Sequence, residues 1–568
     1  MDGFFGEPIE LNYADLPLRS EQSGDTQVVP ASGTETRFLF EVGKVRSLGA
    51  AGAQISLDSI ALCRAHKQKE DSCLVRAGHI GSQVKIISGG TWVIATIRAV
   101  HSEDPIAGGL LADVEFLGEG GADPDGTIAA PFHRGVTNYP EPGALVFAVT
   151  SPDAARIYGC RDAQAIAIGT VYPSQDVKAA VHADAFIGRH FALLGSTGTG
   201  KSTATALILH KICDLAPQGH VLLIDPHGEY RAAFRDRGEV FDVDNLQLPY
   251  WLLNFDEHCE LLLGSDAPPQ SADRNILARC LITARQKAAS GKAAARIAAD
   301  TPVPYLLSDL SHALQSEMGA LDKAHDIAPY LRLRRQLDAV RSDPRFAFMF
   351  SGVLVADTMA EVLARLFRLP ARGKPVSVLD LSGVPTDVVS VLVSLLARLA
   401  FEHAMWARRD DRKPILFVCE EAHRYVPASL DGRTASAGRM LGRIAKEGRK
   451  YGVSLGLITQ RPSDLAPEIL SQCGTLMSMR LSNEQDQSFV RAAMPEGSKS
   501  LLDAIPALRN RECIICGEGV SIPMRLMFDE LADNLRPASD DPAVFQAWSS
   551  LEDSKALIDR TIQRWRGQ

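Results

Sequence analysis

A glycine-rich segment that carries a lysine and a serine is the most specific chemical feature of the sequence. It reads Gly195, Ser196, Thr197, Gly198, Thr199, Gly200, Lys201, Ser202 and Thr203. Glycines let backbone N–H groups turn toward phosphate oxygens, and a helix N-terminus attracts anions. The pattern predicts that Lys201 reaches the β- and γ-phosphates of a nucleotide and that Ser202 ligates Mg²⁺. The expected ligands are therefore ATP and Mg²⁺.

Hydrolysis at such a site also requires carboxylates, one on the metal's water shell and one that orients the attacking water. Two apolar runs end in acidic residues: Asp225 and Glu229 follow the first, and Glu420 and Glu421 follow the second. A parallel sheet would present both groups at its carboxyl edge. The adjacent pair is the better candidate, with Glu420 on the metal side, through water, and Glu421 as the catalytic carboxylate. Asp225 and Glu229 would line the same cleft in a supporting role.

A third apolar run, 454–458, ends in Thr459, Gln460 and Arg461. An uncharged amide at this place can contact the γ-phosphate or orient water. Gln460 is therefore a candidate sensor of the γ-phosphate, and the alternative is a simple turn at the end of a strand.

A basic helix is predicted between the second and third runs. At about 100° per residue, four basic side chains share one face: Arg439, Arg443, Lys446 and Lys450. The opposite face is apolar and carries Met440, Leu441, Ile444 and Ala445. The plain interpretation is a solvated helix surface.

Arginines beside a nucleotide site have two further uses. They can enter the site of a neighbouring subunit to stabilise developing charge, or they can contact a phosphate backbone. Two arginines are candidates for entering a neighbouring site. Arg449 lies on the flank of the basic face, and Arg189 lies just before the apolar run that precedes the glycine-rich segment.

The elements around these motifs indicate the fold class. From about residue 180, apolar runs typical of buried parallel strands alternate with longer helical stretches, which predicts an α/β fold with a RecA-like parallel sheet. Before it, short β-type runs separated by glycines predict a small β-barrel. The segment 255–370 has helical periodicity and predicts an insertion in the α/β domain.

The predicted domain boundaries follow from these changes of pattern. They are an N-terminal tail at 1–35, a barrel domain at 36–178, an ATPase core at 179–254 and 371–530, the helical insertion at 255–370, and a helical C-terminal tail at 531–568.

Composition limits the possible functions. The chain has 568 residues with 60 Lys and Arg against 69 Asp and Glu, a formal charge of −9. Hydrophobic residues make up 46%, which is typical of globular domains and excludes a fibrous or largely disordered protein. Because a general nucleic-acid coat is usually basic, contact with nucleic acid must be confined to a local surface.

The cysteines and the apolar runs indicate a cytoplasmic protein. Ten cysteines show no disulfide framework, which suits a reducing compartment. Cys513 and Cys516 have C-x-x-C spacing, but their apolar setting favours a core strand over a metal site. No basic and apolar export signal is visible, and the apolar runs are shorter than a membrane span.

Five motifs in a fixed order carry a family resemblance. They are the P-loop at 195–202, Asp-Pro-His-Gly-Glu-Tyr at 225–230, Glu-Glu-Ala-His-Arg-Tyr at 420–425, Glu-Gly-Arg-Lys-Tyr-Gly at 447–452 and Thr-Gln-Arg-Pro at 459–462. In this order the chain resembles the HerA-type ATPases of the HerA/FtsK superfamily, from about residue 36 to 530. The barrel and the helical insertion are also placed as in that family.

The resemblance implies a hexameric ring that translocates along double-stranded DNA through a central channel, driven by ATP hydrolysis between subunits. It implies that Lys201 and Ser202 bind nucleotide and Mg²⁺, that Glu421 activates water and that Gln460 senses the γ-phosphate. Arg189 and Arg449 would be stabilising arginines. Many relatives carry Asp where this chain has Glu420, so hydrolysis is expected to be slow without loss of binding.

The resemblance also implies a partner effector, a NurA-like or other nuclease or a sirtuin-like NADase, in DNA-end processing or antiphage defence. Three functions are compatible with the sequence. The first is a DNA translocase that feeds an effector, and the second is an ATP-dependent ring scaffold that activates an effector without processive movement. A secretion or conjugation ATPase of the VirB4 type is the third, and the barrel and the missing membrane segment weigh against it.

Overall fold

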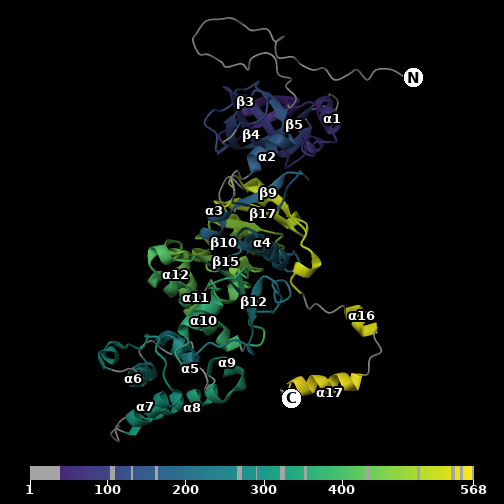
Figure 1. Cartoon of the computed structure of the whole chain (residues 1–568). Helices are drawn as coiled ribbons and strands as arrows, with labels where there is room; N and C mark the ends of the chain where they lie inside the picture. Colours follow the sequence, from purple (N-terminus) through teal and green to yellow (C-terminus); the bar gives the residue numbers. More distant parts are fainter. Residues whose placement is uncertain are drawn as a thin grey trace, which may run out of the picture.

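The computed structural model describes most of the chain (Figure 1). The described residues are 39–102, 109–129, 132–159, 164–174, 176–264, 271–288, 291–319, 326–350, 355–384, 386–428, 435–494, 499–538, 544–549 and 554–565. The predicted N-terminal tail lies outside them.

The first domain is a six-stranded antiparallel barrel, as the sequence predicts. Its strands pair in the order β2-β1-β7-β3-β4-β5, and the pairing of β2 with β5 closes the barrel. A short strand, β6 (His133–Arg134), extends β5, and helices α1 (Ser59–His66) and α2 (Ser151–Tyr158) flank the barrel. The barrel strands are β1 (Glu41–Leu48), β2 (Gly52–Leu57), β3 (Gln83–Ser88), β4 (Thr91–Ser102), β5 (Leu110–Gly121) and β7 (Leu145–Ala148).

A buried ion pair fixes α2 against the barrel. Lys85 Nζ on β3 lies 2.8 Å from Asp153 Oδ2 on α2, and neither side chain is exposed. Asp153 also accepts hydrogen bonds from Thr150 at the helix N-terminus and from the backbone N–H of Ile128. Because these partners satisfy the carboxylate, the charged pair is tolerated in an apolar core.

The second domain is built on an eleven-stranded sheet in the order β12-β13-β11-β14-β15-β10-β16-β17-β18-β8-β9. The strands from β12 to β16 are parallel and the rest are antiparallel. The parallel strands are β10 (Phe191–Leu194), β11 (Val221–Asp225), β12 (Gly238–Phe241), β13 (Val376–Asp380), β14 (Ile415–Cys419), β15 (Val453–Thr459) and β16 (Thr475–Ser478).

The antiparallel extension moves one predicted boundary. It consists of β17 (Glu512–Gly517), β18 (Met524–Phe528), β8 (Ala165–Val171) and β9 (Lys178–His182). The sequence predicts a barrel domain up to residue 178, but β8 pairs with β18 and β9 pairs with β8 in the large sheet. Non-local pairing of this kind has no signature in the local pattern. Cys513 and Cys516 lie buried in β17, as predicted for a core strand.

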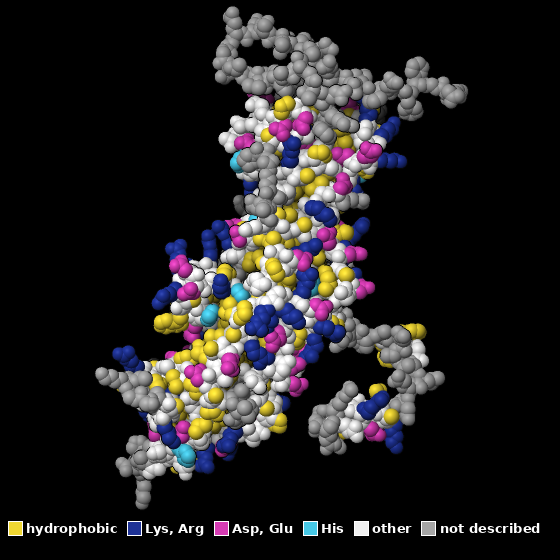
Figure 2. Space-filling view, viewed as in Figure 1, with side chains coloured by type: hydrophobic (Ala, Val, Ile, Leu, Met, Phe, Trp, Pro, Cys, Tyr) yellow, Lys and Arg dark blue, Asp and Glu magenta, His cyan; other side chains and the backbone are white. Residues whose placement is uncertain are grey.

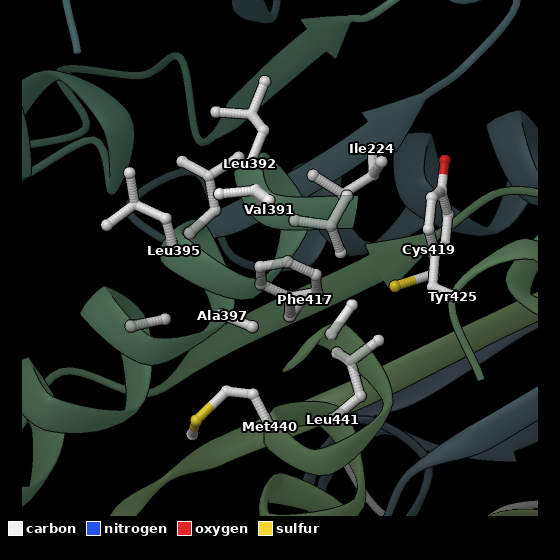
Figure 3. Close-up of a cluster of buried hydrophobic side chains, with 14 of the residues drawn as sticks. Ile224, Val391, Leu392, Leu395, Ala397, Phe417, Cys419, Tyr425, Met440 and Leu441 are labelled. Atoms are coloured by element: carbon white, nitrogen blue, oxygen red, sulfur yellow. The ribbon is translucent and has the colours of Figure 1, made fainter. Parts of the chain in front are cut away.

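Helices cover both faces of the sheet, which explains why its strands are apolar throughout. Alternate residues point to opposite faces: Leu223 packs in one core with α4 (Lys201–Leu215), whereas Ile224 packs in the other with α11 (Thr386–Trp406) and α12 (Ala435–Tyr451). Figure 3 shows Ile224, Phe417 and Leu441 in this second core. The sheet is thereby held rigidly between two apolar layers.

The predicted insertion is helical (Figure 1). Buried charged side chains join it to the core. Arg398 on α11 lies 2.8 Å from Glu257 on α5, and both side chains are almost fully buried. Ser394 also donates a hydrogen bond to Glu257. The helices of this region are α5 (Phe255–Leu263), α6 (Ala272–Ala288), α7 (Leu307–Gly319), α8 (Ala328–Ser342), α9 (Ala347–Phe350) and α10 (Met359–Leu366).

The remaining helices are short. They are α3 (Ala183–Gly188), α13 (Pro467–Leu470), α14 (Glu484–Ala493), α15 (Lys499–Leu502), α16 (Val544–Ser549) and α17 (Ser554–Trp565). Within the described residues, one helical stretch, Val388–Trp406, has the length and hydropathy of a membrane span. Because 78% of its most apolar window is buried inside the domain, it is a core helix.

Candidate nucleotide site

The P-loop joins the carboxyl end of β10 to the first turn of α4. Gly198 and Gly200 have φ angles of +76° and +98°, which side chains other than glycine rarely adopt. Neighbouring strands fix the loop, since the Gly195 N–H donates to the Thr459 carbonyl (3.2 Å) and the Ser196 N–H donates to the Arg480 carbonyl (2.9 Å). The loop is therefore shaped for phosphate by its backbone and by the sheet edge.

Lys201 lies inside this loop. It is only 8% exposed, and its Nζ donates to the Ser196 carbonyl at 3.1 Å. Burial lowers the pKa of Lys201, and the carboxylates of Glu420, Glu421 and Glu229 oppose that change. A partly desolvated ammonium among acids is suited to bind the negative oxygens of a nucleotide, because its attraction for them is weakly screened.

Glu420 ends β14 in a buried position, with 4% of its surface exposed. Its carboxylate accepts a hydrogen bond from the Tyr230 hydroxyl at 2.7 Å. Burial, together with the neighbouring charge of Glu421, raises the pKa of Glu420 to about 8. Tyr230 did not figure among the predicted site residues, and nothing in its local sequence distinguishes it from a core tyrosine.

Glu421 has an unusual backbone for a non-glycine residue, with φ at +51°. Strained positions of this kind persist where the surrounding structure determines them, and they gather at functional sites. The side chain is 11% exposed, and its Oε2 lies 3.3 Å from His423 Nδ1. This Oε2 is buried and accepts no hydrogen bond from the described residues. The turn after β14 therefore presents a carboxylate oxygen that lies near an imidazole nitrogen without being satisfied by a hydrogen bond, so it can accept a proton from water.

A Mg²⁺ ion fits these residues. The serine hydroxyl of Ser202 and the carboxylate of Glu420 are hard oxygen donors, which Mg²⁺ prefers. Among the described residues no group of three or more His, Cys, Asp or Glu side chains could hold a metal ion. Mg²⁺ is usually bound by one or two protein groups together with substrate phosphates and water.

Asp225, which is predicted to line the cleft in a supporting role, binds backbone groups of the turn that follows β11. Its carboxylate is fully buried and accepts hydrogen bonds from the backbone N–H groups of four successive residues, 227–230, at 2.9 to 3.3 Å. It therefore holds the turn that places Tyr230 under Glu420. The sequence pattern shows an acid at a strand end but not that backbone groups occupy it. Glu229 is half-buried and lies close enough to act on the charge of Lys201.

Replacing Asp225 with alanine is expected to lower the free energy of unfolding by about 1–3 kcal/mol or more, because several buried N–H groups lose their acceptor. Asp225→Asn keeps one acceptor oxygen and is expected to lose less. Urea denaturation of the two variants measures the difference. Equal stability of Asp225→Ala and the unmodified protein would show that the turn does not depend on this carboxylate.

Gln460, the predicted sensor, follows β15 and lies at the P-loop. The Thr197 hydroxyl donates a hydrogen bond to Gln460 Oε1. β15 is the immediate neighbour of β10 in the sheet, with Leu194 opposite Thr459. The amide is thus joined to the loop that would surround the terminal phosphates.

Arg189 and Arg449 lie at the other edge of the sheet. Arg189 precedes the amino end of β10 and forms an ion pair with Glu518, and Arg449 is exposed near the end of α12, just before β15. The four residues of β10 alone span roughly 13 Å. Neither arginine is therefore placed at the P-loop of its own chain.

The basic face of α12 is exposed and its apolar face is buried, as the periodicity predicts. Figure 2 shows Lys and Arg side chains over the region that Figure 1 labels α12. Two of the four have acidic partners, Arg443 with Glu447 at 3.5 Å and Lys446 with Glu468 at 3.3 Å. These pairs are exposed, so solvent and salt weaken them, and the face keeps its basic character.

Comparison with known proteins agrees with this site. The family model described as the central domain of helicase HerA matches residues 166–400, which include the P-loop and the turn after β11. The DNA double-strand break repair helicase HerA of Pyrococcus furiosus is 26% identical over 457 residues, covering 72% of this chain and 78% of the relative. The chain is therefore similar to the HerA-type ATPases over most of its length.

A second relative extends the comparison. The probable DNA double-strand break repair helicase HerA of Methanocaldococcus jannaschii is 25% identical over 426 residues, covering 68% of this chain and 80% of the relative. Among solved structures, VirB4 of Thermoanaerobacter pseudethanolicus is similar with a TM-score of 0.48 and 17% identity, covering 66% of this chain and 99% of that one. The similarity to these HerA relatives covers most of the length of both chains.

Proposed function

We propose that this protein is a HerA-type ATPase that forms a ring and translocates along double-stranded DNA. The proposal is supported by the relatives named as DNA double-strand break repair helicases. The single observation that carries the ring is the placement of Arg189 and Arg449 at the sheet edge opposite to the P-loop. An arginine there can act on a nucleotide only across a subunit interface.

The residues at the carboxyl edge divide the chemistry among them. The P-loop N–H groups and Lys201 bind the phosphates, and Ser202 with Glu420 would hold Mg²⁺, which supplies charge neutralisation when bound. Glu421 accepts the proton of the attacking water through Oε2, which accepts no hydrogen bond from the described residues. Gln460 orients the terminal phosphate or that water, since it is already hydrogen-bonded to Thr197.

The DNA-binding surface belongs to the inside of the ring. The chain as a whole carries a charge of −9, which opposes general binding to DNA. A hexamer that turns exposed basic faces, such as that of α12, toward a central channel would confine the attraction for phosphates to the channel.

We further propose a cytoplasmic setting and a partner chain, a nuclease or an NADase, in DNA-end processing or antiphage defence.

The deciding experiment measures the ATPase rate with and without linear double-stranded DNA, together with the mass of the particle in solution. A six-subunit particle whose turnover rises with DNA is the expected result. A ring whose turnover ignores DNA would contradict the translocase and favour the scaffold that activates an effector without processive movement.

Mixing two impaired variants, one without the P-loop lysine and one without an arginine, tests whether an arginine acts across the subunit interface. Arg449→Ala is expected to lower the turnover number, because the neighbouring site loses a charge that stabilises the transition state. Subunits with Lys201→Ala mixed with subunits with Arg449→Ala are expected to regain activity, since some interfaces then combine an intact P-loop with an intact arginine. Arg189→Ala is tested in the same way. Mixtures that stay as inactive as the separate variants would contradict the assignment.

A further inference from the structure

His423 lies between the catalytic carboxylate and the strand that carries the sensor. Its Nδ1 is 3.3 Å from Glu421 Oε2 on one side and 3.0 Å from Thr459 Oγ1 on the other. The side chain is 17% exposed, so the two contacts are largely sheltered from water. The short 3₁₀ turn Ala422–Arg424, which follows the strained Glu421, places the ring at this point.

The partners of Nδ1 indicate which tautomer is present. A carboxylate oxygen only accepts hydrogen bonds, and Thr459 Oγ1 can accept them as well. A proton on Nδ1 faces both oxygens favourably, whereas a bare nitrogen would be repelled by the carboxylate. The surroundings of the ring contain Asp464, Arg461 and Arg424 besides Glu421, and burial lowers the pKa of His423. The neutral ring with its proton on Nδ1 therefore fits this environment.

Thr459 connects this ring to both nucleotide-binding elements. Its carbonyl accepts the N–H of Gly195, the first residue of the P-loop, and its hydroxyl oxygen accepts the N–H of Arg461 at 3.0 Å. Gln460 follows directly and is hydrogen-bonded to Thr197. If a phosphate displaces Gln460, Thr459 must therefore move as well, because the two residues share a peptide unit.

We propose that His423 is a positioning residue that couples the sensor strand to the catalytic carboxylate through Thr459. In this arrangement the orientation of Glu421 depends on the state of Gln460, so that water is activated only when a terminal phosphate is in place. The inference rests on the proposed role of Glu421 as the catalytic carboxylate. It assigns His423 to positioning and not to direct contact with the nucleotide.

Two substitutions at the ring separate contact from volume. His423→Phe keeps a ring but removes Nδ1, with its contact to Glu421 and its hydrogen bond to Thr459. It is expected to lower kcat about 10- to 100-fold, the usual cost of losing a partner that orients a group of the active site. KM for ATP and the affinity for a non-hydrolysable ATP analogue are expected to change less than about twofold, since His423 touches no phosphate-binding group. His423→Asn, which places an amide N–H near Nδ1, is expected to restore most of kcat.

A second variant tests the path to the sensor strand. Thr459→Val has nearly the same volume and removes the hydroxyl, so it is expected to lower kcat as His423→Phe does. Because both changes break one contact, the double variant is expected to be no slower than the more impaired single variant. Independent, multiplying losses in the double variant would overturn the coupling.

Controls distinguish the possible failures. His312→Ala, at an exposed position of α7, is expected to leave kcat unchanged. Thermal unfolding of each variant shows whether the fold is retained, and His423→Asn serves as the folded comparison if His423→Phe is unstable. If Glu421→Gln is inactive but His423→Phe has unchanged kcat, the role of His423 is overturned and the proposed catalytic site is kept. Unchanged kcat in Glu421→Gln would overturn the proposed site as well.

Discussion

Glu421→Gln is expected to lower ATP turnover by about 10²–10⁴-fold, the usual contribution of a positioned general base. Glutamine fills the same volume, so the strained turn after β14 can keep its shape, but an amide does not accept the proton of water. ATP affinity is expected to persist, because the Lys201 ammonium and the P-loop N–H groups are unchanged. The structure singles out this residue, since its Oε2 is buried and without a hydrogen bond in the described part of the chain.

The measurement combines steady-state turnover with equilibrium binding of ATP. Glu468→Gln is the matched control, since its side chain is 78% exposed on α13, and its turnover is expected to equal that of the unmodified protein. Normal turnover in Glu421→Gln would refute the assignment of the catalytic carboxylate. Loss of ATP binding in the same variant would mean that the change acts on the fold of the site.

The second large effect is expected at Lys201. Lys201→Ala removes a charge-assisted hydrogen bond to the phosphates, each such bond being worth about 1.5–3 kcal/mol. The expected loss of ATP affinity is therefore about 10- to 100-fold. It also leaves Glu229, Glu420 and Glu421 without their shared cation, so repulsion between these acids and the phosphates adds to the loss.

Binding of a fluorescent ATP analogue measures this loss directly. Lys413→Ala is the control, because Lys413 is exposed just before β14 and lies on the amino side of the strand. Its affinity for the analogue is expected to match that of the unmodified protein. Equal affinity in Lys201→Ala would contradict the proposed contact between this ammonium and the phosphates.

Local patterns in the sequence determine much of the fold. The run that forms β10, followed by glycines and a helix-forming stretch, predicted the strand, loop and helix at 191–215. The spacing of basic and apolar residues over 439–450 predicted the exposed and the buried face of α12. These predictions held because burial on both sides of a parallel strand, or on one side of a helix, imposes a period that neighbouring residues carry themselves.

The tertiary structure alone decided how distant segments meet. β8 and β9 join the large sheet through β18, about 350 residues away in the chain. Asp225 is occupied by four backbone N–H groups, and His423 reaches Thr459 on the next strand. Such contacts depend on strand order and on the exact path of turns, which the period of a sequence does not encode.

The sequence by itself determined the class of chemistry, since the P-loop spacing and the acids after two apolar runs are local features of the chain. Which of those acids is free to act, and at which edge of the sheet each arginine lies, was decided only by the folded structure. Asp225 and Glu421 are both acids at strand ends, yet one caps a turn and the other has a free oxygen. The physical reason is that a carboxylate's role depends on its hydrogen-bond partners and burial, which come from residues far away in the chain.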